Sequence, residues 1–122
     1  MIFFHLTGEF DLGEDLVPEV MLNDTDASAI RELLGLTAKK VRLSSVENQV
    51  ETTVDILSGT LEGPELLKVL ERCEFLVENP FYVESQIKGW NPVLRDIIHA
   101  SLKEMHELLY FAKVAGCGIA WS

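Results

Sequence analysis

The sequence has few basic residues and no long apolar run. Lysine and arginine number 10 against 20 acids, so the 122-residue chain carries a formal net charge of −10. This deficit excludes binding of nucleic acid or an anionic membrane through a broad basic surface. No stretch approaches the roughly 18 uninterrupted apolar residues that cross a bilayer, so we expect no membrane segment.

Cysteine is also scarce, and it occurs at Cys73 and Cys117 without the C-x-x-C spacing of redox or zinc sites. The first basic residue is Arg31, so the beginning of the sequence lacks the positive charge typical of a secretory signal. We therefore expect two reduced thiols and a cytoplasmic protein.

Motifs for catalysis and metal binding are missing as well. The chain has no G-x-S-x-G, P-loop or G-x-G-x-x-G pattern. His99 and His106 are seven residues apart, about 10 Å along a helix axis, which is too far for the pair to chelate one metal. The sequence therefore predicts no enzyme activity, no cofactor and no metal site.

The composition that remains is globular, with 48% hydrophobic and 25% charged residues. One domain over residues 1–122 is expected at this length. Apolar runs at residues 1–7 and 119–121 predict two buried strands, which we expect side by side. Residues 20–22 and 39–44 predict further short extended segments.

Start and stop signals predict the helices. Candidate N-caps at residues 23–26 and Gly35 bound a short helix over residues 27–34. Pro64 begins a second helix that must end before Pro80, with an apolar stripe that includes Leu67 and Phe75. The longest helix runs from Pro92 to about residue 115. Between the last two, the aromatic segment 81–87 predicts a strand.

Residues 45–58 fit two patterns. Val46, Val50 and Val54 follow helical spacing after an S-x-x-E capping box at Ser44 and Glu47. The same segment also alternates apolar and polar residues from Val50 to Ile56, as a strand does. We favour the helix, which gives an α+β fold of about four helices packed on a small sheet that includes both chain termini.

Acidic residues are concentrated in the first part of the chain. The first 67 residues hold 13 of the 20 acids but 4 of the 10 bases. In a helix over residues 45–58, acids at i, i+4 and i+8 would form one unrelieved stripe. The predicted partner-binding residues are this stripe and two acids that precede it: Glu14, Asp15, Glu47, Glu51 and Asp55.

Such a surface predicts a function in protein binding. The acids would steer fast association with a basic protein, such as a toxin or an enzyme, and then cover its active site. Immunity proteins and antitoxins that neutralise a nuclease-like toxin work in this way, and the likeness is one of size and charge.

Two other functions stay open. A pocket between the sheet and the last helix would make the chain a small-ligand-binding or enzymatic domain, with His99, His106, Tyr110 and Arg95 as its polar groups. A structural homodimer through the apolar residues around Phe81 and Tyr82 is the other, so the oligomeric state is a monomer or a homodimer.

Overall fold

The computed structural model describes residues 1–8, 17–36, 38–44, 49–55, 59–87 and 92–122, with 38–44 and 49–55 described by their backbone. Within these ranges the elements, in chain order, are β1 (Ile2–Leu6), β2 (Val20–Leu22), α1 (Asp24–Leu34), β3 (Ala38–Ser44), β4 (Gln49–Asp55), β5 (Gly59–Leu61), α2 (Gly63–Glu78), α3 (Pro80–Gln86), α4 (Pro92–Ala115) and β6 (Ile119–Trp121). The expected α+β fold is confirmed, and no helix of the described ranges is long and apolar enough to cross a membrane.

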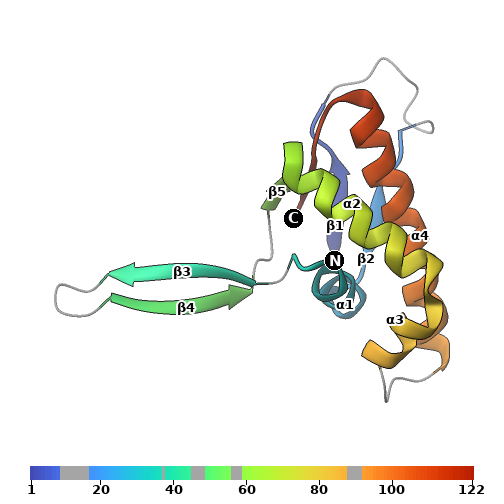
Figure 1. Cartoon of the computed structure of the whole chain (residues 1–122), viewed down its shortest axis with the longest axis horizontal. Coiled ribbons are helices and arrows are strands. Elements are labelled where there is room, and N and C mark those ends of the chain that lie inside the picture. Colours follow the sequence, from blue (N-terminus) through green and yellow to red (C-terminus); the bar gives the residue numbers. More distant parts are fainter. Residues whose placement is uncertain (9–16, 37, 45–48, 56–58, 88–91) are drawn as a thin grey trace.

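Four strands form an antiparallel sheet in the order β2-β1-β6-β5 (Figure 1). The first and last strands are neighbours, as predicted, with Phe4 opposite Trp121. Burial alternates along β1, where Ile2, Phe4 and Leu6 are buried. The sheet therefore turns one apolar face towards the helices.

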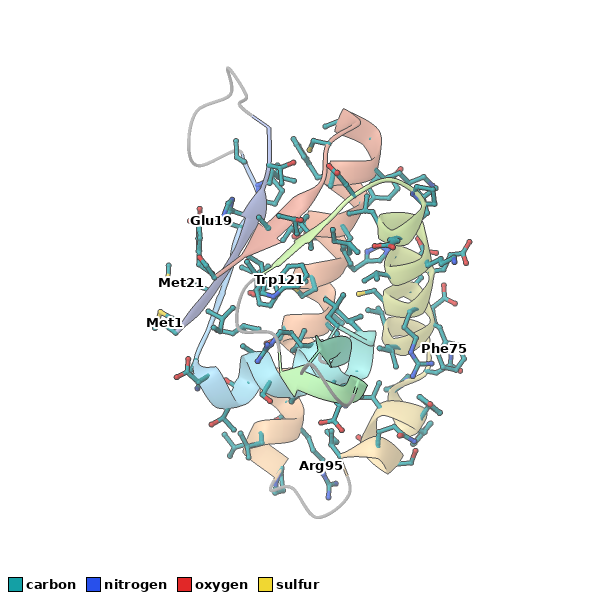
Figure 2. The ribbon with its side chains drawn as sticks, turned by 90° about the vertical axis from the view of Figure 1, so that its left-hand side faces the viewer. Met1, Glu19, Met21, Phe75, Arg95 and Trp121 are labelled. Carbon is teal, nitrogen blue, oxygen red and sulfur yellow. The ribbon has the colours of Figure 1, made fainter. Side chains whose placement is uncertain are left out.

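The helices cover that face. α4 packs against β1, β2 and β6, and α1 and α2 both contact α4. Trp121 lies inside this core, whereas Met1, Glu19 and Met21 lie on the far side of the sheet (Figure 2). The core thus lies between one sheet and a layer of helices, and exposed residues lie on the outer sides of α2 and α3.

Local signals begin and end the helices largely as expected. The Asn23 side chain accepts the backbone N–H of Asp26 and caps α1, and Gly35 ends it in the left-handed conformation at φ 77°. Ile30, Leu33 and Leu34 are buried, as predicted. In α2 the apolar stripe is narrower than predicted, because Leu67 and Phe75 are exposed.

Two predicted elements are wrong. The helix over residues 45–58 is instead strand β4 over its described part, paired with β3 in a separate hairpin that Figure 1 places to one side of the helices. Cross-strand pairs such as Leu43 with Val50 and Val41 with Thr52 use the alternating pattern, and β-branched residues favour a strand. Residues 45–48 and 56–58 lie outside the described ranges.

The strand predicted over residues 81–87 is also wrong, because Pro80–Gln86 forms α3. Proline pre-forms the first helical turn, and the Asn79 carbonyl accepts the N–H groups of Tyr82 and Val83. Asn79 itself is outside the helical region, at φ −124° and ψ 68°, which ends α2 and turns the chain. An Asn-Pro pair therefore begins α3, just as a second one precedes α4.

Candidate functional site

The acids predicted to bind a partner are not brought together as one helical stripe. Glu14, Asp15 and Glu47 lie outside the described residues. Glu51 and Asp55 belong to β4, where Glu51 stands opposite Arg42 and Asp55 opposite Ala38. The stripe without a neighbouring base is therefore wrong, because the register places a base directly across from Glu51.

A different surface emerges where α3 folds back beside the end of α2. Phe81 is 85% exposed and Phe75 is 41% exposed, although both are large aromatic residues. Figure 2 shows Phe75 on the outer side of α2. Single exposed apolar residues are common on proteins, but two aromatic rings on adjoining helices are typical of an interface.

Arg72 contacts one of these rings, Phe75, and the neighbouring ring of Tyr82. Its guanidinium carbon lies 5.6 Å from the centroid of the Phe75 ring and 5.3 Å from that of Tyr82. Arg72 Nη2 donates to Tyr82 Oη at 3.3 Å, and Nε donates to the Leu33 carbonyl at 3.2 Å. Phe75 and Tyr82 meet edge to face with centroids 5.2 Å apart. One side chain thus ties α1, α2 and α3 together and pre-organises the aromatic cluster.

Acidic residues lie one turn from each exposed ring along its helix, Glu71 and Glu78 from Phe75 and Glu84 from Phe81. Glu71 and Glu78 are exposed, one turn before and one turn after Phe75 on the same side of α2. Glu74 on α2 and Glu84 on α3 are partly exposed. We define the acid–aromatic face by the exposed rings and these acids: Glu71, Glu74, Phe75, Glu78, Phe81 and Glu84. Lys68, one turn before Glu71, is the exposed base nearest in sequence to this face on α2.

The polar groups proposed for a ligand pocket do not converge. His99 Nε2 lies 3.6 Å from Glu84 Oε1, and His106 Nε2 lies 3.4 Å from Glu74 Oε1. His106 also stacks on Tyr110, with ring centroids 6.3 Å apart. The described ranges contain no group of three histidine, cysteine or acidic side chains that could hold a metal.

An open groove of about 890 Å³ does lie between the beginning of α2 and the end of α4. Leu66 and Leu67 line one wall, and Lys113 and Cys117 line the other. None of the four predicted pocket residues lines it. The groove that the structure describes is therefore not the pocket that was expected to carry those polar groups.

The two cysteines differ in their surroundings: Cys73 is buried and Cys117 is partly exposed. Neither is in a disulfide, as predicted. Burial, with a smaller effect of Glu74, raises the pKa of the Cys73 thiol to about 12, and its Sγ donates to the Leu102 carbonyl at 3.4 Å. A thiol with so high a pKa stays protonated, so Cys73 is structural rather than nucleophilic.

The sequence suggested Phe81 and Tyr82 as contact residues of a homodimer, but it did not group them with Phe75 and the acids of α2, because Phe75 was assigned to the apolar stripe and residues 81–87 to a strand. The Asn79-Pro80 pair was the available signal for α3. No protein-family model, no curated protein and no solved structure matches this chain.

Proposed function

We propose that this chain is a small acidic protein-binding module that neutralises a basic protein partner. The observation that carries the proposal is the 85% exposed side chain of Phe81, which is three residues from Glu78 at the end of α2 and three from Glu84 on α3. Exposed aromatic residues are frequent hot spots, because they bury a large apolar area at a small entropic cost. Surrounding acids select a partner that presents lysine or arginine around an apolar side chain.

The charge distribution supports the same function at long range. A chain of net charge −10 attracts a cationic partner before contact, which raises the association rate at low salt. On contact, Phe81 and Phe75 would supply the short-range part of the affinity. The partner surface that this arrangement suits best is a cationic active site, so the role resembles that of an immunity protein or antitoxin.

A reducing cytoplasm is the proposed setting, since unbridged cysteines are typical of that compartment. The small-ligand and homodimer functions remain predictions beside this one. A homodimer through Phe81 would bring two acidic faces together, and like charges across an interface oppose association.

Affinity capture with matched variants tests the proposal. Tagged chain is used as bait at low salt in extracts of its own cells, and bound protein is eluted with a salt gradient. We expect a basic protein at a one-to-one ratio. Phe81→Ala should lose it, whereas Val114→Ala, which truncates a 70% exposed apolar residue at the far end of α4, should keep it.

A second pair of variants tests the charge. Glu71→Lys with Glu78→Lys should abolish capture, and Asp96→Lys with Glu104→Lys, which reverses two exposed acids of α4, should weaken it only slightly. Equal retention by all variants, or retention of an acidic protein, would show that the acid–aromatic face is not the binding site.

A further inference from the structure

Two histidines of α4 lie close to two carboxylates of the acid–aromatic face. His99 lies 3.6 Å from Glu84 of α3, and His106 lies 3.4 Å from Glu74 of α2. All four side chains are partly exposed, so solvent protons reach them. Half of the four carboxylates of the face are thus in contact with a group that changes charge near neutral pH.

Other charged or titratable side chains lie near each imidazole. On α4, Arg95, Asp96 and Lys103 lie one turn from His99, and Lys103 and Tyr110 lie one turn from His106. On α2, Glu71 and Glu78 lie one turn from Glu74. Imidazole is the side-chain group that ordinarily changes charge between about pH 5.5 and 7.5, whereas carboxylate, ammonium, guanidinium and phenol groups ordinarily do not.

The effect on a partner follows from the sign of the charges. A neutral imidazole leaves Glu74 and Glu84 as full negative charges for a cationic partner. A protonated imidazole at 3.4–3.6 Å offsets each of them and competes for the same carboxylate oxygen. Acidification thus offsets two of the four carboxylate charges of the acid–aromatic face and leaves Phe75 and Phe81 unchanged.

Building on the proposed function, we propose that His99 and His106 make binding at the acid–aromatic face pH-dependent. The complex with a cationic partner is tight at pH 7.5 and weakens at pH 5.5. Two partly exposed charge pairs of this kind change affinity by about fivefold in total. The same protonation strengthens the links from α4 to α2 and α3, so the weakening comes from lost attraction and not from unfolding.

The test uses a defined probe, a synthetic amphipathic peptide of lysine, arginine, leucine and phenylalanine without histidine or acids. Its charge is constant over the pH range, so any change belongs to the protein. Kd is measured by fluorescence anisotropy at pH 7.5 and 5.5 and constant ionic strength. We expect a Kd about fivefold higher at pH 5.5 for the unmodified chain. His99→Gln with His106→Gln should bring the ratio close to one.

His5→Gln is the matched control, because His5 lies on β1 and contacts Phe3, away from α2 and α3. It should keep the fivefold ratio. If circular dichroism shows that the double variant is unfolded, each single variant is used instead and should lose part of the ratio. A Kd that is equal at both pH values, or a ratio that survives in the folded variants, overturns this inference alone. A peptide that binds at neither pH overturns the proposed function itself.

Discussion

Removal of Arg72 is the most informative perturbation, because this residue both links three helices and contacts the ring of Phe75 on the acid–aromatic face. Arg72→Ala deletes two cation–π contacts, with Phe75 and Tyr82, and two hydrogen bonds, to Tyr82 Oη and the Leu33 carbonyl. Partly exposed cation–π contacts contribute about 0.5–1 kcal/mol each, and hydrogen bonds from a charged donor about 1.5 kcal/mol. We expect the free energy of unfolding to fall by about 3 kcal/mol, since such contributions overlap.

Urea unfolding followed by circular dichroism measures this loss. Tyr82→Phe keeps the ring and removes the hydroxyl, so it should lose about 1 kcal/mol. The two changes remove the same hydrogen bond. The free energy of unfolding lost in the double variant should therefore be about 1 kcal/mol smaller than the sum of the two single losses. Arg72→Lys keeps the charge without the planar fork and should fall between the alanine variant and the unmodified chain.

The same variants separate folding from binding. Arg72→Ala should also lose partner capture at a temperature where it remains folded, because Phe75 and Tyr82 are no longer held in place. A loss of less than 1 kcal/mol, or strictly additive losses in the double variant, would refute the role assigned to Arg72.

Three further predictions concern the rest of the chain. Gly118→Ala places a Cβ 2.5 Å from the β5 backbone and should cost about 3 kcal/mol in urea unfolding, whereas Gly116→Asn, at an open left-handed position, should cost well under 1 kcal/mol. Because the pKa of the Cys73 thiol is raised, its contribution to the free energy of unfolding is fully present below pH 9 and falls between pH 9 and 12 by up to about 1 kcal/mol per pH unit. Cys73→Ala should remove this contribution to the slope in alkaline denaturation. Glu51→Lys with Asp55→Lys should slow association with the captured partner, measured by stopped flow, and unchanged rates and salt dependence would remove both from the site.

Capping residues made much of the fold predictable. Asn23 and Gly35 delimit α1, and Pro92 begins α4, because these signals act within a few residues of the chain. The secondary structure of residues 49–55 could not be predicted from local signals, since their apolar residues fit both the helical and the strand period. Pairing with β3, in which Val41 and Leu43 lie opposite Thr52 and Val50, favours the strand.

The candidate site was harder to predict than the fold, because exposure is a tertiary property. Periodicity alone assigned Phe75 to the apolar stripe, and only the chain reversal at Asn79 places it at a margin, beside Tyr82. The acids of β4 were grouped by an assumed helix, and the cross-strand position of Arg42 changes their surroundings. Sequence spacing predicts which residues share an element, but not which side of the element other elements cover.

The order of the strands has a consequence for folding during synthesis on the ribosome. β6 lies between β1 and β5, so the sheet is continuous only when the last strand has entered it. The hydrogen bond from the Gly118 N–H to Thr7 Oγ1 spans 111 positions in sequence. A ribosome adds about 5–20 residues per second, so several seconds pass between the synthesis of β1 and that of β6. During that interval β1 has β2 as a strand partner but lacks β6, so in pulse-labelled chains the β1 amides that bond to β6 should become protected only after residue 121 emerges.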